Sequence, residues 1–159
     1  MNISPTILFR LTYQHEAING IIASKTKERL HHFPAPGKWS IHDNIVHLAK
    51  YQPIFIERVH KILKENTPEF GRYRAEDDVE FETWRAWDTV KLLERIKQDR
   101  GKIVDLATSL DENQVMRIGI HKKFGELSFE MWLEFFLLHE AHHIYTMFQL
   151  ANDVEIKTT

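Results

Sequence analysis

The sequence predicts an all-α protein built as a four-helix bundle. Apolar residues recur at helical spacing in four long stretches, and almost no stretch alternates between apolar and polar residues as a half-buried strand does. A chain of 159 residues has the usual size of one domain and can bury a full core. Because no repeat, low-complexity tract or linker interrupts it, we expect a single domain over residues 1–159.

The first helix is expected to begin at Ser4 and Pro5, a plausible N-cap followed by proline at the first helical position. It should continue to His31 and His32, where Pro34 and the residues after it end it. The apolar residues on one of its faces are Leu8, Leu11, Ile18 and Ile22.

The second helix should open at Ser40, with Asp43 three residues later as the acidic partner of a capping box. Pro53 lies within it and is expected to kink it, since proline removes the bond to the carbonyl four residues back. The apolar positions are Ile41, Ile45, Leu48, Phe55, Val59 and Ile62.

A polar connection over residues 66–82 should lead to a third helix from about Trp84 to Leu110, in which Gly101 is a weak point. We expect a loop over residues 111–127. The fourth helix should then start after Ser128, a suitable cap.

Composition limits the chemistry and the partners. The chain has no cysteine, so a bound metal ion must use nitrogen and oxygen ligands; zinc, nickel, manganese and ferrous iron fit, and iron–sulfur clusters are excluded. With a net charge of −2 it has no general excess of cations for nucleic acid. The first residues lack a secretory signal and no apolar run is long enough to span a membrane, so we expect a soluble, cytoplasmic protein.

Two histidines indicate a metal site. His139 and His143 are four residues apart in the apolar fourth helix, so their rings lie on one face and can share an ion. Two neighbouring imidazoles without a shared ligand would be costly to bury, although each could instead be a core histidine bonded to backbone. His47, at the edge of the apolar face of the second helix, is the leading candidate for a third ligand.

The other polar residues near these positions receive less specific predictions. Asp43 is one turn before His47 and could orient that imidazole, or serve only in the capping box. His15 is expected in the core and His142 at the surface or in packing, with a supporting role near the metal as an alternative. We expect solvent exposure for His31, His32, His42, His60 and His121.

Three segments together resemble the DinB superfamily of metal-binding bundles. Residues 39–48, WSIHDNIVHL, are similar to the W-S-x-x-[ED]-x-[IVL]-x-H-[LI] pattern that opens the second helix of that family. His139 and His143 match the H-x-x-x-H of its last helix, and residues 125–132 resemble the usual approach to it. The resemblance implies a DinB-like bundle in which His47, His139 and His143 hold a divalent ion. It also implies a small-molecule substrate, in several branches with a low-molecular-weight thiol as cosubstrate, and a possible homodimer.

Three neutral imidazoles would leave an ion its full charge and an open coordination position, as in catalytic sites. Such an ion lowers the pKa of a bound water or thiol and so generates a nucleophile near neutral pH. Together with what the resemblance implies, this makes a metal-dependent hydrolase or thiol S-transferase the favoured prediction.

Two alternatives from other classes remain open. The segment from His139 through Glu140 to His143 matches the H-E-x-x-H signature of metallopeptidases, in which the glutamate is the general base. Glu140 is accordingly a weak candidate for a catalytic residue. Alternatively, the protein could be a non-catalytic bundle whose metal only ties helices together.

Overall fold

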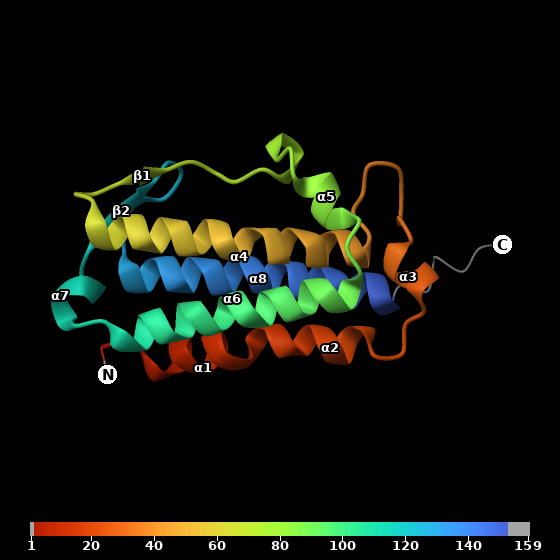
Figure 1. Cartoon of the computed structure of the whole chain (residues 1–159), viewed down its shortest axis with the longest axis horizontal. Helices are drawn as coiled ribbons and strands as arrows, with labels where there is room; N and C mark the ends of the chain where they lie inside the picture. The colour runs from red at the N-terminus through yellow and green to blue at the C-terminus, as the bar shows by residue number, and fades with distance from the viewer. Residues whose placement is uncertain (1, 153–159) are drawn as a thin grey trace.

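The computed structural model describes residues 2–152. It confirms the predicted helical bundle: three long helices, α4 (Ile41–Lys64), α6 (Thr89–Ser109) and α8 (Phe129–Asn152), lie side by side. The shorter helices α1 (Pro5–Tyr13) and α2 (Ala17–Ile22) together form the fourth rod, with α1 against α6 and α2 against α8 (Figure 1). Within the described residues no helix is both long and apolar enough to cross a membrane.

The first predicted helix is not continuous. A turn of 3₁₀ helix (Gln14–Glu16) separates α1 from α2, and a further short helix, α3 (Lys27–His31), follows a turn. The hydroxyl of Thr26 accepts a hydrogen bond from the backbone N–H of Arg29 and so begins α3 as a new helix. The prediction of one helix to His31 was wrong because these local caps interrupt the apolar periodicity.

Helix α4 begins as predicted, with a reciprocal capping box. The Asp43 backbone N–H donates to the Ser40 hydroxyl at 3.1 Å, and the Ser40 N–H donates to the Asp43 carboxylate at 2.9 Å. The helix then runs through Pro53 as one element of 24 residues.

The third predicted helix is two helices. Helix α5 (Phe81–Arg85) ends before residues 86–88, and Asp88 then caps α6 by accepting from the Val90 N–H at 2.8 Å. Trp84 therefore lies on α5, where it stacks on Trp87 with 4.5 Å between ring centroids.

A small sheet lies at the end of the bundle where α7 (Glu112–Val115) is found, and the expectation of a strand-free connection and loop was wrong. Strand β2 (Ile118–His121) pairs antiparallel with β3 (Gly125–Ser128) and parallel with β1 (Glu69–Phe70). Gly125 has φ +77°, which the tight turn of this hairpin requires and which glycine adopts without strain. At Gly119, a Cβ atom would lie 2.8 Å from Ile62 and 3.0 Å from the Trp132 indole nitrogen.

The core is divided along the bundle. One apolar cluster contains Phe55, Trp132 and Phe136, and a second contains Ile45 and Met147. On α8 the residues between Phe136 and Met147 include both histidines of the predicted metal pair, so the site lies where one apolar cluster gives way to the other.

Candidate metal centre

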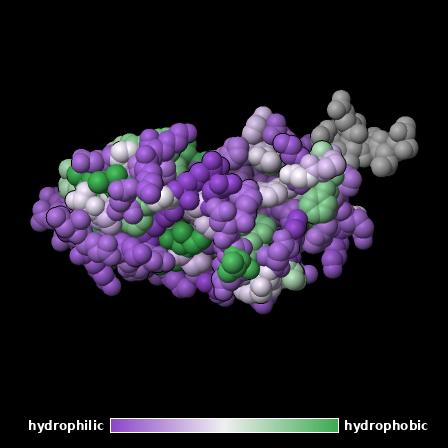
Figure 2. All heavy atoms as spheres, turned by 90° about the horizontal axis from the view of Figure 1, so that it is seen from above, coloured by the Kyte–Doolittle hydropathy of each residue, from purple (hydrophilic) through white to green (hydrophobic). Residues whose placement is uncertain are grey.

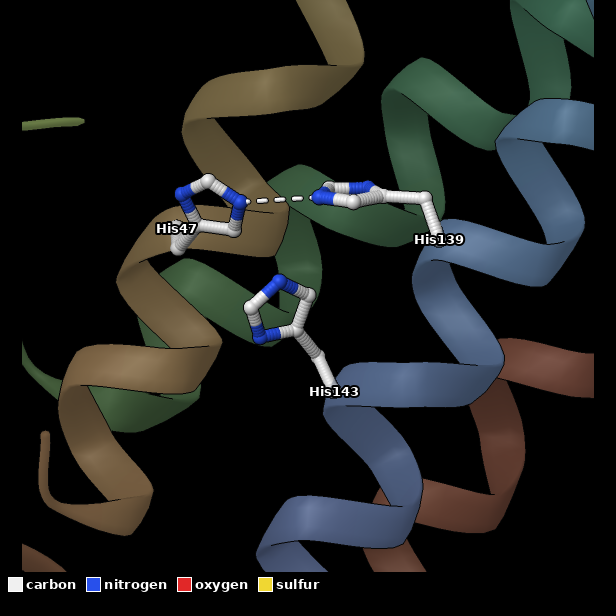
Figure 3. Close-up of side chains that lie close together, drawn as sticks. All are labelled: His47, His139 and His143. Atoms are coloured by element: carbon white, nitrogen blue, oxygen red, sulfur yellow. Dashed lines mark hydrogen bonds between the residues drawn. The ribbon is translucent and has the colours of Figure 1, made fainter. Parts of the chain in front are cut away.

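The structure brings together the three histidines that the sequence singled out. His47 projects from α4, and His139 and His143 project from successive turns of α8 (Figure 3). One ring nitrogen from each lies within 4.8 Å of the other two. The Nε2 atoms of His47 and His139 are 3.0 Å apart, and the near nitrogen of His143 points toward the gap between them.

Asn44 orients the third imidazole, and sequence reasoning missed it. Its side-chain N–H donates to the Ser40 carbonyl at 2.8 Å, so its Oδ1 faces the other way and accepts from His143 Nδ1 at 2.8 Å. His143 must therefore carry its proton on Nδ1, which leaves the Nε2 lone pair free for an ion. Asn44 precedes His47 by three residues and so shares its helix face, a signal that the spacing did contain.

All three imidazoles are held neutral. Burial is the main cause, and together with like charge on neighbouring groups it lowers the pKa of each to about 3. Neutral imidazole is the form that binds a metal, so these rings need no deprotonation near neutral pH.

The donor set fits a divalent ion. Tetrahedral coordination with Zn–N bonds of about 2.0–2.1 Å places ligand nitrogens about 3.3 Å apart, close to the 3.0 Å between His47 and His139. The Nδ1 atoms of these two rings are buried without a hydrogen-bond partner among the described residues. A shared ion would give a physical reason for bringing the Nε2 atoms of two buried imidazoles within 3.0 Å of each other.

Aromatic side chains pack around the three rings. Trp39 stacks on His143 with centroids 6.0 Å apart, and Tyr73 stacks on His47 with centroids 5.5 Å apart. The Tyr51 ring lies 4.5 Å from that of His139. These contacts restrict the rotation of the imidazoles and keep the cluster in one arrangement.

Tyr73 is itself anchored. Its hydroxyl donates to Asp78 at 2.8 Å, and the buried Lys50 ammonium lies 3.3 Å from the same carboxylate and 2.6 Å from Glu80. Burial and the neighbouring Asp78 raise the pKa of the Tyr73 hydroxyl, so it stays protonated. This network ties the segment after β1 to α4 and holds it beside the cluster.

A cavity of about 570 Å³ opens beside the three histidines. Its walls come from α4, α8, the segment from Arg72 to Glu76, and the hairpin turn at Lys123 and Phe124. That volume accommodates a small molecule, and a site for small molecules is typically a concave space of this size. The cluster is therefore reachable by a ligand.

The structure corrects two predictions of exposed histidines. His42 is buried, with Nε2 donating to the Arg85 carbonyl and Nδ1 accepting from the Thr89 hydroxyl, each at 2.9 Å. His121 is also buried, and its Nδ1 accepts from the backbone N–H groups of Lys123 and Phe124. Both rings are bonded by residues that tertiary folding or a turn brings to them.

The remaining histidine predictions agree with the structure. Exposed rings are found for His31, His32 and His60. His142 is exposed at the edge of the cavity, and His15 is buried, with a pKa lowered to about 4 mainly by burial.

The two carboxylates considered for the site lie elsewhere. Asp43 accepts from Ser40 and from Arg85 Nε at 2.7 Å, so it serves the helix cap rather than His47. Glu140 is 1% exposed and is bonded by Arg100 and, at 3.0 Å, by Gln14. It does not line the cavity.

Comparisons with known proteins concern the fold and the family. The family model of the DinB superfamily matches residues 10–147. The fold is similar to that of YfiT from Bacillus subtilis, with a TM-score of 0.82 at 21% identity, over 96% of this chain and 90% of that chain. YfiT is described as a probable metal-dependent hydrolase with an unusual four-helix bundle topology. No match was found among curated proteins. Because the family model spans most of its length, the chain belongs to the DinB superfamily.

Proposed function

We propose that this protein is a metal-dependent enzyme that acts on a small molecule, with His47, His139 and His143 as the ligands of one divalent ion. The observation that carries the proposal is the convergence of three neutral imidazoles within 4.8 Å beside an open cavity. When bound, zinc, nickel, manganese or iron would lower the pKa of a water or thiol and supply a nucleophile near neutral pH.

The surroundings of the cluster favour catalysis over a purely structural role. A closed structural zinc site has four protein ligands, whereas three histidines leave a coordination position open. The three histidines also line a cavity large enough for a substrate. A metal that only joined helices would need neither feature.

Three residues that contact the histidines would support the metal site: Asn44, Trp39 and Tyr73. Asn44 fixes the tautomer of His143. The stacked rings of Trp39 and Tyr73 limit the movement of His143 and His47 and shield them from bulk water. The reaction would be hydrolysis with water as the nucleophile, or S-transfer with a low-molecular-weight thiol. In either case the nucleophile would give up its proton and bond to the electrophilic atom, while the bond to the leaving group breaks and the leaving group departs with the electron pair.

The peptidase alternative receives no support from the geometry. A general base must come within hydrogen-bond reach of the proton that it removes. The Glu140 carboxylate instead forms a buried ion pair with Arg100, on the side of α8 that faces α1 and α6. A homodimer and a cytoplasmic location stay predictions of the sequence.

The first experiment measures metal content after purification without a nickel column. The parent protein should carry close to one divalent ion per chain, and alanine at His47, His139 or His143 should lower that occupancy sharply. His60→Ala is the matched control because its ring is exposed. The buried His42 and His121 are unsuitable controls, since their replacement would disturb packing. Equal occupancy in all four variants would refute the assignment.

The second experiment separates hydrolysis from thiol transfer. The metal-loaded parent protein, and the His139→Ala protein incubated with the same metal, are assayed against a panel of esters and amides, and against electrophiles with an added thiol. Turnover that needs both His139 and the thiol supports a transferase, and turnover without thiol supports a hydrolase. A metal-loaded protein inactive in both panels would count against the catalytic proposal.

A further inference from the structure

The cavity beside the three histidines has a strong positive bias. Five cationic side chains line it and one acid does: Lys38, Arg58, Arg72, Arg74 and Lys123 against Glu76. The chain as a whole has 21 lysines and arginines and 23 acids, so chance placement would give near balance. The charge is concentrated here while the protein is slightly acidic. Figure 2 shows the face of the molecule above α4, which is largely hydrophilic, with apolar side chains in separate spots.

Most of these cations have no carboxylate partner. In residues 2–152, no ion pair is formed by Lys38, Arg72 or Lys123. Arg74 pairs with the exposed Asp77 at 3.6 Å, so its charge is partly balanced. Unpaired cations around a concave space raise the local concentration of anions and attract them over several ångströms.

Arg58 lies deeper and is positioned by neutral groups. Its guanidinium donates to the Gly71 carbonyl at 2.7 Å and to the Tyr51 hydroxyl at 3.3 Å. The guanidinium carbon lies 5.7 Å from the centre of the Tyr51 ring, and that ring also packs against His139, so Tyr51 contacts both Arg58 and the histidine cluster.

The nearby acids do not cancel this charge. Asp78 is bonded by Tyr73 and Lys50, and Asp77 by Arg74. Both line a second space, which Arg58, Arg72 and Arg74 also line, and neither lines the cavity beside the histidines. The neutral imidazoles add no negative charge, and a bound divalent ion would make the cavity still more positive.

We propose that the cavity binds an anionic small molecule, whose carboxylate or phosphate group lies on Arg58, Arg72 and Lys123 while its reacting atom faces the three histidines. This inference rests on the proposed function and deepens it by naming the charge of the substrate or cosubstrate. Arginine suits the task because its planar N–H groups match the geometry of carboxylate and phosphate oxygens.

A pair of thiols matched in size tests the anion site separately from the proposed function. Mercaptoacetate and 2-mercaptoethanol have similar size, but only the first carries a carboxylate. The full chain loaded with cobalt(II) is titrated with each, and the thiol-dependent absorption band reports binding. We expect at least tenfold tighter binding of mercaptoacetate at low salt, with the difference shrinking as salt is added. Equal affinities would overturn the anion site, whereas no band with either thiol would count against thiol activation itself.

Substitutions of the cavity cations test where the carboxylate of mercaptoacetate binds. Arg72 and Lys123 are exposed, so Arg72→Gln and Lys123→Gln leave the core intact. We expect each substitution to weaken the binding of mercaptoacetate about threefold, and the double variant to weaken it about tenfold. The binding of 2-mercaptoethanol should not change. Arg72→Lys should recover most of the loss. Lys64→Gln, an exposed lysine at the end of α4 that does not line the cavity, should have no effect.

A measurement without metal excludes binding through the ion alone. Inorganic phosphate and citrate are titrated calorimetrically into the metal-free parent and double-variant proteins. Binding by the parent that the double variant loses supports the site. Anion binding that requires metal and His139, and that is unchanged in the double variant, would place the anion on the ion and overturn the proposal.

Discussion

Replacing Asn44 with alanine tests how the third imidazole is oriented. The change removes the oxygen that accepts the His143 Nδ1–H, so the ring can rotate and can also adopt the tautomer with its proton on Nε2. Metal affinity should fall although every ligand is still present. Asn44 is 1% exposed, so bulk water does not replace the lost acceptor freely.

The expected magnitude follows from the contact. Loss of a group that orients a ligating histidine typically weakens metal binding about 10–100-fold. At about 1.4 kcal/mol per tenfold, this is about 1.4–2.8 kcal/mol. A net hydrogen-bond contribution of about 1 kcal/mol is of the same order, and the tautomer change adds to it.

The assay is competition for zinc against a chromophoric chelator at pH 7, with the thermal stability of the metal-free proteins measured in parallel. Gln52→Ala is the matched control: it also removes a buried amide from α4, but Gln52 does not line the cavity. It should lower stability without changing zinc affinity. The orienting role of Asn44 is refuted if Asn44→Ala binds zinc as tightly as the parent protein, or if Gln52→Ala lowers zinc affinity as much as Asn44→Ala does.

Three further predictions concern stability. The lowered pKa values, about 3 for the cluster and about 4 for His15, mean that below pH about 6.5 the unfolded chain takes up protons that the folded chain excludes. The free energy of unfolding, measured with urea, should therefore drop between pH 7 and pH 5. The drop is at most about 1.4 kcal/mol per pH unit for each histidine. A free energy of unfolding that does not change over this pH range would contradict the burial of neutral rings. Glu140→Gln should lower the free energy of unfolding by about 3 kcal/mol, because it leaves the buried Arg100 charge without its partner. Zinc affinity should not change. If the parent protein cleaves peptides and this substitution abolishes the cleavage, the peptidase interpretation is restored. Gly119→Ala should destabilise the protein by about 1–3 kcal/mol, because the added methyl group overpacks the hairpin against Ile62 and Trp132. Gly101→Ala should stabilise it by about 1 kcal/mol, because Gly101 lies in α6 with open space around it. Equal changes in melting temperature for the two variants would refute the close packing at the hairpin.

The features predicted well depend on neighbours along the chain. The capping box of Ser40 and Asp43 spans three residues, and the pairing of His139 with His143 spans four. Helical geometry alone converts such spacings into a shared face. His47 was found at the edge of an apolar face, and the structure brings it to the other two rings.

The features missed depend on residues far apart in the sequence. His42 is buried by Thr89 and by the Arg85 carbonyl, more than forty residues away. The sheet escaped detection because β1 has two residues, β2 and β3 have four each, and Gly119 interrupts the strand pattern of β2. No local periodicity reports a parallel pairing between residues near 70 and 120.

The histidines and the cavity cations are carried by different kinds of backbone. All three proposed ligands lie on helices packed through the bundle core, whereas Arg72 and Lys123 lie on an extended segment and a hairpin turn. Surface connections tolerate substitution and insertion far more readily than a packed helix. A change of length or charge in these two connections should therefore alter which anions the cavity binds while the three-histidine cluster persists. For engineering of the proposed enzyme, the choice of substrate would be altered by exchanging residues 71–76 and 122–124, and the type of reaction by changing the helices that carry the histidines.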